Sequence, residues 1–187
     1  MERRITWNTS AQFFIFSMNR TILTLAFMRF FGLFAHADSL AVGAPAPTLT
    51  ATSQDGTPVE FSKIYDRGIT LVYFYPKAET PGCTAQACSL RDSYADLSAE
   101  GVQVIGVSRD KVAAQKKFQE KYKLPFTLIA DEDGSVAKAF GVGLIPVVGL
   151  AMRESFLVKD GKIAWVSPKA QTSTHAQEVR DAVKALK

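Results

Sequence analysis

Three short stretches of the chain are rich in β-branched, apolar and aromatic residues. They are Ile69–Tyr75 (ITLVYFY), which ends at Pro76, Val102–Ser108 (VQVIGVS) and residues 126–131 (FTLIAD). Short runs of this composition, bounded by turn-forming residues, are typical of strands that are buried on both faces of a sheet. The pattern therefore predicts three strands in the core of the domain.

A helical repeat of apolar residues follows the first of these strands. It runs from about Pro81 to Ala99, and Gly101 is suited to stop it. Its inward stripe consists of Ala87, Leu90, Tyr94 and Leu97. The spacing predicts one helix that packs a single apolar face on the sheet.

Two shorter helices are predicted after the second and third strands. Asp110 is suited to cap a helix that runs to about Tyr122. Residues 134–143 predict a short helix, and residues 141–152 form an apolar, Gly-rich loop.

One hairpin is predicted before the three buried strands and another after them. Asp55-Gly56 separates two short alternating segments within residues 44–68, and Asp160-Gly161 divides residues 153–167 in the same way.

Thr174 and Gln177 form a capping box for a last helix. Its apolar stripe consists of Ala176, Val179, Val183 and Leu186. The order of elements predicts an α/β domain, with a mixed central sheet and helices on both faces.

Residues 1–37 differ in composition from the expected domain, residues 38–187. From Met18 they have a basic start, an apolar middle and an A-x-A site ending at Ala37, typical of a signal peptide for export or the periplasm. Arg29 interrupts the apolar middle, so an organelle transit peptide, or a wrong start codon on a cytoplasmic protein, are the alternatives. The longest uncharged run, Ile5–Asn19, is shorter than the roughly 18–20 residues of a membrane-spanning helix.

The charge of the chain is concentrated before the expected domain. Of the formal net charge of +4, residues before Asp38 contribute +3, which leaves 18 basic and 17 acidic residues. A nearly neutral domain argues against a nucleic-acid-binding protein, which needs a clustered basic face.

The two cysteines, Cys83 and Cys88, lie near the start of the predicted helix. In an intact helix, five positions separate them by roughly 140° around the axis, and their Cα atoms lie about 8–9 Å apart. A disulfide needs less than about 7 Å. The helix therefore cannot stay intact and also hold this bond.

Four roles are open to this pair. A permanent disulfide would suit an exported protein, but it would strain the start of the helix. A metal site would need further ligands, and the only histidines are His36 and His175. The others are two inert buried thiols, and a reactive pair that alternates between a closed helix and an opened, oxidised form. The spacing favours the reactive pair.

Cys83 is the better candidate for the reactive thiol. Pro81 suits the first turn of a helix, so Cys83 lies where unpaired N–H groups and the helix dipole favour an anion. The thiolate is the nucleophilic form of cysteine. Thr80 and Thr84 flank Cys83 and offer hydroxyl hydrogen bonds, or simply cap the helix. Cys88 lacks the dipole and is better suited to attack an oxidised Cys83.

Pro76, Thr80 and Cys83 form a P-x-x-x-T-x-x-C pattern within residues 73–92, YFYPKAETPGCTAQACSLRD. The motif resembles that of peroxiredoxins of the AhpC/TSA superfamily, in particular the Q-type group (bacterioferritin comigratory proteins). The similarity extends over about residues 44–187. It implies a thioredoxin-like fold and the reduction of hydrogen peroxide and organic hydroperoxides, without a metal or an organic cofactor.

The resemblance also implies a role for each matching residue. Cys83 would be the peroxidatic thiolate and Cys88 the resolving cysteine, which forms an intramolecular disulfide. Thr80 would hydrogen-bond the thiolate and the peroxide, and Pro76 would shield the sulfur from water. Arg153, in RESFLVKDGKI, matches the family's active-site arginine and would favour the thiolate.

The chain departs from the family pattern at two places. Gln86 stands where many relatives have Glu, which removes a charge contact to the arginine. The loop of residues 141–152 is more hydrophobic than expected. The implied partners are a peroxide and thioredoxin or a similar dithiol reductant, and the implied state is a monomer.

Two other functions fit the same fold. A thiol-disulfide oxidoreductase normally uses C-x-x-C, whose closer spacing permits a disulfide without unwinding. A redox-sensing or binding module would use the apolar loop near Leu144–Leu150 as a docking patch.

Overall fold

The computed structural model of the chain describes residues 39–187, and the expected leader, residues 1–37, lies outside them. In chain order the elements are β1 (Thr50–Thr52), β2 (Pro58–Glu60), α2 (Phe61–Tyr65), β3 (Ile69–Phe74), α3 (Pro81–Asp92), α4 (Tyr94–Ala99), β4 (Val102–Ser108), α5 (Val112–Tyr122), β5 (Thr127–Ala130), α6 (Ser135–Ala139), β6 (Ser155–Lys159), β7 (Lys162–Ser167) and α7 (His175–Ala185).

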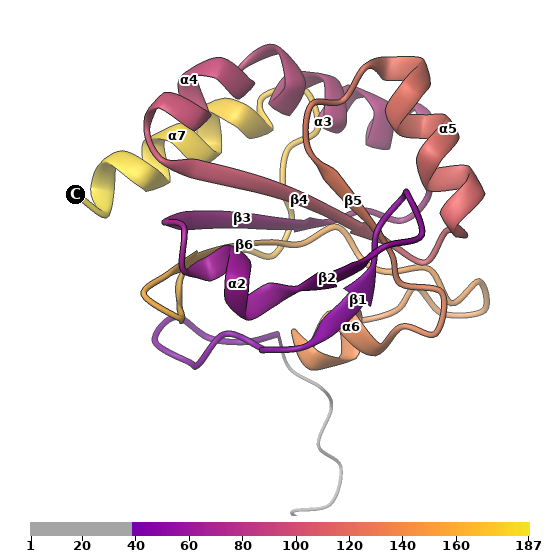
Figure 1. The fold of residues 1–187 in the computed structure, drawn as a ribbon, viewed down its shortest axis with the longest axis horizontal. Helices are drawn as coiled ribbons and strands as arrows, with labels where there is room; N and C mark the ends of the chain where they lie inside the picture. The colour runs from indigo at the N-terminus through magenta and orange to yellow at the C-terminus, as the bar shows by residue number, and fades with distance from the viewer. Residues whose placement is uncertain (1–38) are drawn as a thin grey trace, which may run out of the picture. The chain divides into compact units, whose positions relative to one another are not determined.

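A mixed sheet in the order β5-β4-β3-β6-β7 forms the centre of the domain (Figure 1). β3, β4 and β5 are parallel, whereas β6 pairs antiparallel with β3 and β7 antiparallel with β6. In this register Tyr73 of β3 lies opposite Gly106 on one side and Ser155 on the other. The predicted α/β class with a mixed sheet is confirmed.

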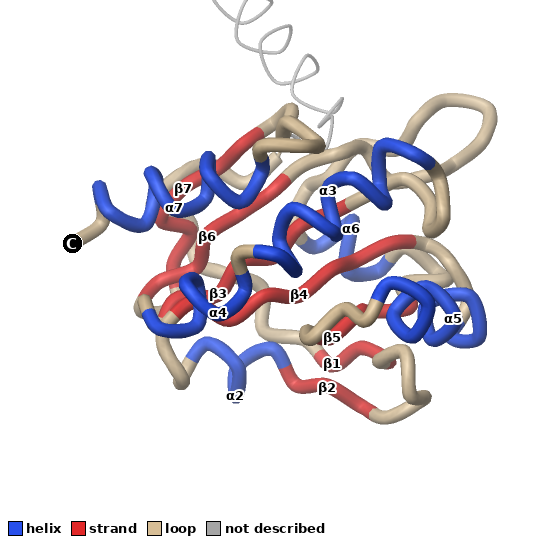
Figure 2. The backbone as a smooth tube through the Cα atoms, turned by 90° about the horizontal axis from the view of Figure 1, so that it is seen from above, coloured by secondary structure: helices blue, strands red, loops and turns tan. Residues whose placement is uncertain are grey.

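Helices cover both faces of the sheet, as the alternation of side chains along β3 requires. Leu71, Tyr73 and Tyr75 pack in a core cluster with residues of α3, α4, α5 and α7, while Val72 and Phe74 pack in a second cluster with residues of α2 and α6. Figure 2 shows α3, α4, α5 and α7 together on the near side of the sheet. The continuous apolar run of β3 is therefore explained by burial on both faces.

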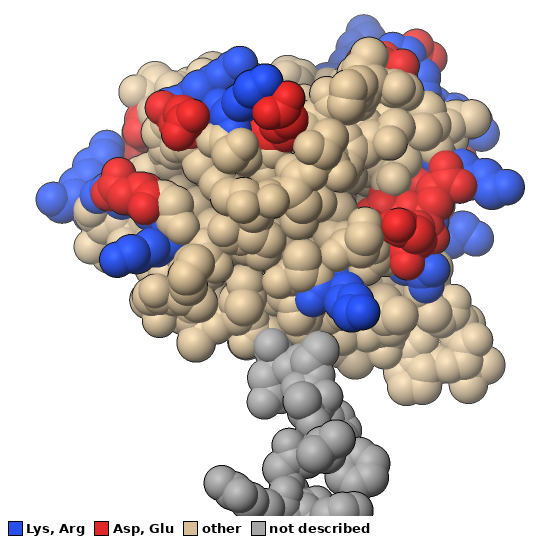
Figure 3. Space-filling model, turned by 60° about the horizontal axis from the view of Figure 1, so that its bottom comes forward, with Lys and Arg blue, Asp and Glu red and all other residues tan. Residues whose placement is uncertain are grey.

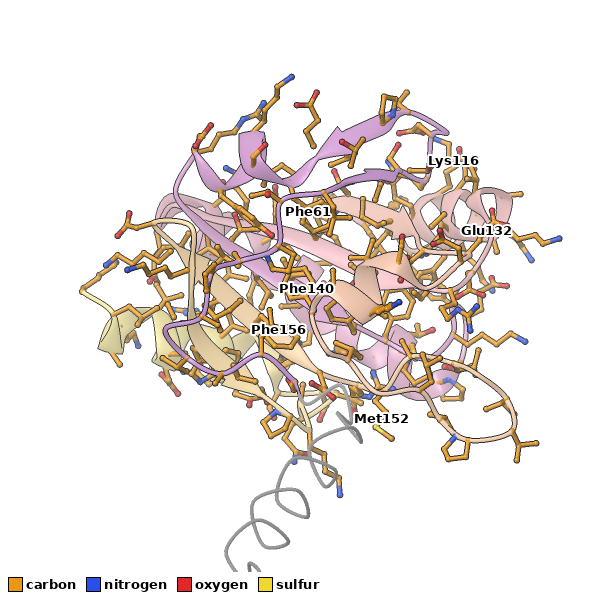
Figure 4. All side chains as sticks on the ribbon, turned by 90° about the horizontal axis from the view of Figure 1, so that it is seen from below. Phe61, Lys116, Glu132, Phe140, Met152 and Phe156 are labelled. Carbon is orange, nitrogen blue, oxygen red and sulfur yellow. The ribbon has the colours of Figure 1, made fainter. Side chains whose placement is uncertain are left out.

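The cluster on the α2 and α6 side is built around aromatic rings. Phe140 lies 6.2 Å from Phe61 and 5.2 Å from Phe156 between ring centroids, and Figure 4 shows the three beside one another in the interior. Phe74 joins them from the sheet, 5.4 Å from Phe140. These contacts leave the opposite face of β3 to carry the site described below.

Both predicted hairpins are confirmed, but the predicted helix from about Pro81 to Ala99 is instead two helices. α3 and α4 are separated at Ser93, whose backbone angles of −103° and 7° depart from the helix. The inward stripe persists, because Leu90 and Leu97 are fully buried and Tyr94 packs against the same cluster. The five-residue helix α2 is too short to show a periodicity and was not predicted.

The predicted cap at Asp110 is wrong, and the capping box predicted at Thr174 is correct in position but does not form its side-chain bonds. The N-cap of α5 is Lys111, and the Asp110 carboxylate instead accepts hydrogen bonds from the Ala78 N–H and the Ser108 hydroxyl, both at 2.7 Å. Thr174 is the N-cap of α7 but makes no side-chain cap bond, and Gln177 donates to Asp181. At Asp110 and at Gln177 a different contact outweighs the local preference.

Charges of both signs are mixed on the surface. On the face in Figure 3, Lys and Arg side chains are interspersed with Asp and Glu. Among the described residues, contacts between opposite charges include Lys116–Asp55 and Lys63–Glu60, both at 2.7 Å. Among residues 39–187, no helix has the length and apolar character needed to cross a membrane.

Two stacked tyrosines under α3 give a test of the packing. Tyr73 and Tyr75 are fully buried, but within residues 39–187 only the Tyr75 hydroxyl has a hydrogen-bond partner, the Gln115 side-chain oxygen. We expect Tyr75→Phe to lower the free energy of unfolding by about 1–3 kcal/mol, because it leaves a buried amide oxygen unpaired. The matched variant Tyr73→Phe should cost nothing or stabilise. Urea unfolding of both variants checks this, and equal losses would contradict the assignment.

Candidate active site

Cys83 lies in the first turn of α3, as predicted. Thr80 is the N-cap residue and Pro81 the first helical residue. The first bond of the helix runs from the Thr84 N–H to the Thr80 carbonyl at 2.9 Å, so the N–H groups of Gly82 and Cys83 precede the helical ladder. These groups form the positive end of the helix dipole. The side chain of Cys83 is 1% exposed, so the thiol lies beneath the surface turn.

Arg153 approaches this thiol from the sheet. It lies two residues before β6, and the antiparallel pairing of β6 with β3 brings it to the end of β3 from which the chain passes to α3. Its Nη2 atom donates to Cys83 Sγ at 3.3 Å. A Cβ atom at Gly82 would lie 3.4 Å from Nη2, so the small residue at 82 leaves room for the guanidinium over the first turn.

Gln86 and His175 extend this contact into the interior. The second terminal nitrogen of the guanidinium, Arg153 Nη1, donates to the Gln86 side-chain oxygen, and Gln86 Nε2 lies 3.0 Å from His175 Nδ1. Gln86 and His175 are both fully buried. The neutral amide therefore contacts the arginine through a hydrogen bond, where a Glu would make a charge contact.

His175 is uncharged in this environment. Burial, with a smaller effect of the Arg153 charge, lowers the pKa of His175 to about 4. Because the Gln86 oxygen faces Arg153, the amide nitrogen faces His175 Nδ1, which must accept. The imidazole hydrogen then resides on Nε2, which is buried without a hydrogen-bond partner in the described part of the chain.

The loop between β3 and α3 carries Pro76 and Thr80. Pro76 is half-buried and lies two residues after the end of β3. The Thr80 hydroxyl donates to the Lys77 carbonyl at 2.9 Å, and so neither caps the helix nor donates to Cys83 in this state. Glu79 adopts a left-handed backbone conformation (φ 62°) and pairs with Lys117 and Lys121 of α5 at 3.2 and 2.8 Å. The loop is thereby fixed to α5.

Cys88 lies within the same uninterrupted helix as Cys83. Both thiols are free, and Cys88 is half-buried. Arg91 lies beside Cys88; its own pKa is raised mainly by the Asp92 carboxylate and less by this thiol. The structure thus describes the reduced arrangement, in which the helix is closed.

The apolar loop of residues 141–152 leads directly into Arg153. Its ends are joined by a hydrogen bond from the Met152 N–H to the Gly143 carbonyl at 2.8 Å, and Figure 4 shows Met152 at its base. Val147 and Val148 at its tip are exposed. The Arg109 guanidinium holds the loop by donating to the Gly149 carbonyl at 2.6 Å.

The site has no arrangement suited to a metal. Within residues 39–187, no three His, Cys, Asp or Glu side chains come close enough together to hold a metal ion. His175, the first residue of α7, faces Gln86 and not the cysteines.

The inward position of His175 and the contacts of Gln86 with both Arg153 and His175 were not predicted from the sequence. His175, Val179 and Val183 are spaced four residues apart, which places all three on one face of α7, and all three are buried. That spacing was a usable signal for an inward histidine. No comparable signal links Gln86 to both Arg153 and His175, because these contacts span 67 and 89 residues.

Comparison with known proteins places these features in a family. Residues 42–166 match the AhpC/TSA family. The chain is 44% identical over 142 residues to peroxiredoxin Bcp of Escherichia coli K12, covering 73% of this chain and 90% of that protein. It is 41% identical over 146 residues to the chloroplastic peroxiredoxin Q of Oryza sativa subsp. japonica, covering 77% and 67%.

A solved structure shows the same architecture. The bacterioferritin comigratory protein of Xanthomonas campestris, described for its alkyl peroxide reduction activity, aligns with a TM-score of 0.71. The two chains are 27% identical, and the alignment covers 78% of this chain and 99% of that one.

Proposed function

The chain belongs to the AhpC/TSA family as a peroxiredoxin of the Q and Bcp group, a thiol peroxidase, and from that premise we propose that Cys83 is its peroxidatic residue and Cys88 its resolving residue. One contact supports this assignment above the others. Arg153 Nη2 donates to Cys83 Sγ at 3.3 Å, at the first turn of α3. The pair combines a nucleophile with a fixed cation that stabilises it as an anion.

In the first step the Cys83 thiolate attacks one peroxide oxygen. A sulfur–oxygen bond forms as the O–O bond breaks, and the leaving alkoxide or hydroxide takes a proton from solvent. The products are a cysteine sulfenic acid and an alcohol or water. Arg153 and the N–H groups of the first turn would stabilise the charge that moves between the oxygens.

The loop residues supply the remaining contacts in this proposal. The Thr80 hydroxyl would turn from the Lys77 carbonyl to the peroxide, and Pro76 would exclude water from the sulfur. Because Cys83 is almost fully covered, a small peroxide would enter past the exposed Pro81 and the half-buried Gly82.

In the second step α3 opens between the two cysteines. Cys88 attacks the sulfenic sulfur, a disulfide forms, and the sulfenic oxygen leaves as water. Opening is required because an intact helix holds the two Cα atoms about 8–9 Å apart. A dithiol reductant, thioredoxin or a similar protein, would then supply two electrons and two protons to restore both thiols.

The wider setting of the reaction is also part of the proposal. The alkyl peroxide activity described for the Xanthomonas protein supports organic hydroperoxides as substrates alongside hydrogen peroxide. We further propose that the enzyme acts as a monomer and that residues 1–37 direct it out of the cytoplasm or into an organelle, the latter in line with the chloroplastic rice relative.

Measurement of the intact mass distinguishes the proposed roles of the two cysteines. After one equivalent of peroxide, the wild-type chain should lose two hydrogen atoms within seconds, whereas Cys88→Ser should gain one oxygen atom, about 16 Da, since its sulfenic acid has no resolving thiol. Reduction with a dithiol should reverse both changes. Formation of a two-hydrogen-loss product in Cys88→Ser, or thiol loss only over hours in the wild type, would refute the proposed pair.

A further inference from the structure

We propose that His175 is a positioning residue: it holds the Gln86 amide so that its oxygen faces Arg153, which aims the guanidinium at Cys83 Sγ. This inference rests on the proposed roles of Cys83 and Arg153. His175 itself touches neither the sulfur nor a substrate in this account, and it acts through Gln86.

The first step of the argument concerns the two ends of the Gln86 amide. A guanidinium has only donors, so Arg153 is attracted by the amide oxygen and repelled by the amide nitrogen. The two ends of the amide have nearly the same shape, and packing alone does not select between them. Arg153 therefore selects the oxygen end, and the amide is held in that orientation only if the group on the other side of Gln86 accepts from its nitrogen.

His175 is that group. Its Nδ1 lies 3.0 Å from Gln86 Nε2 and, in the neutral imidazole, can accept from it. The lowered pKa of His175, about 4, is consistent with the neutral form. If Nδ1 carried the hydrogen instead, the amide would have to turn its oxygen to His175 and its nitrogen to Arg153. The charge on Arg153 disfavours that second arrangement.

Because the pair is buried, loss of the acceptor at position 175 would disturb the Gln86 amide. Gln86 and His175 are fully buried, so bulk water has no ready access to an acceptor site left vacant at position 175. The Gln86 nitrogen would be left unpaired, and the amide would gain freedom to turn. Arg153 would then lose its fixed partner on Nη1, and Nη2 would no longer be held 3.3 Å from Cys83 Sγ.

The test is the second-order rate constant for oxidation of Cys83 by hydrogen peroxide, followed in single turnover. His175→Phe keeps a ring near Tyr73 but removes the acceptor, and should lower the rate about tenfold to a hundredfold, as misaligned catalytic groups do. His175→Asn, whose side-chain oxygen can take the place of Nδ1, should recover most of it. His175→Leu serves if the Phe variant does not fold.

A matched control separates positioning from stability. Val179→Ala, one turn along the same buried face of α7, should lower Tm and leave the rate constant unchanged. Loss of rate in Val179→Ala as large as in His175→Phe would overturn the proposal.

A double-mutant cycle addresses the mechanism itself. In a Gln86→Glu background either side-chain oxygen can accept from Arg153, so no amide has to be oriented. There the loss from His175→Phe should shrink to less than about threefold. An equal loss in both backgrounds would mean that His175 acts by packing alone. If the wild-type Cys83 is not oxidised by peroxide, the proposed function fails as well; if it is oxidised and the His175 variants match it, only this inference fails.

Discussion

Cys83→Ser should abolish peroxide turnover. Serine keeps a side chain of similar size beside Arg153, but its oxygen does not accept an oxygen atom from a peroxide to form a sulfenic acid. Since the S–O bond is the first bond formed, no later step can proceed, and consumption of hydrogen peroxide with a dithiol donor should fall to the rate without enzyme. A peroxide-consumption assay in steady state measures this directly.

The Cys88→Ser variant is the matched control for that result, because it also replaces a cysteine sulfur by a serine oxygen, five residues later in the same helix. It should still consume one equivalent of peroxide per chain. Thermal unfolding should show both variants folded, as the Cys83 thiol makes one side-chain hydrogen bond among the described residues. Full steady-state turnover by Cys83→Ser would refute the assignment of the peroxidatic residue.

Strong local signals allowed much of the fold to be predicted from sequence. The run at Ile69–Tyr75 and the segment Val102–Ser108 became β3 and β4 because residues buried on both faces must be apolar throughout. The weaker local signals of the caps were less reliable: Asp110 is not the N-cap of α5, and Thr174 is the N-cap of α7 but makes no side-chain cap bond. A cap is a single hydrogen bond, and Asp110 forms a different one with Ala78, which lies 32 residues away in the chain.

The candidate site also combines features that follow from local sequence with features that depend on long-range contacts. The position of Cys83 in the first turn follows from Pro81 and the helical repeat, which are local. The approach of Arg153 depends on β6 pairing antiparallel with β3, and the contact spans 70 residues, so only the family resemblance pointed to it. The Gln86–His175 contact had neither kind of support, because it joins two helices and its partners are a neutral amide and a neutral imidazole.

Arg153→Met should lower the rate constant for oxidation of Cys83 by about 10²–10³, the loss typical of removing one donor that stabilises charge in a transition state. The guanidinium donates to Cys83 and Gln86 at once, which fixes its plane at the thiol. Arg153→Lys should recover only part of the loss, because an ammonium is a point charge on a flexible stem and cannot reproduce the two-pronged contact. Stopped-flow kinetics with hydrogen peroxide measures both variants.

Comparing the rate constants of Arg153→Met and Arg153→Lys distinguishes an effect of positive charge from an effect of guanidinium geometry. If positive charge alone favoured the thiolate, Lys would restore the full rate, and the arrangement of Gln86 and His175 behind the arginine would have no kinetic consequence. If guanidinium geometry matters, the rate constant of Arg153→Lys should be closer to that of Arg153→Met than to that of the wild type. Arg180→Met is the matched control: Arg180 pairs with Asp96 on the surface, so its loss changes the net charge equally and should leave the rate unchanged. A rate loss in Arg180→Met equal to that in Arg153→Met would show that net charge, and not the aimed guanidinium, governs Cys83.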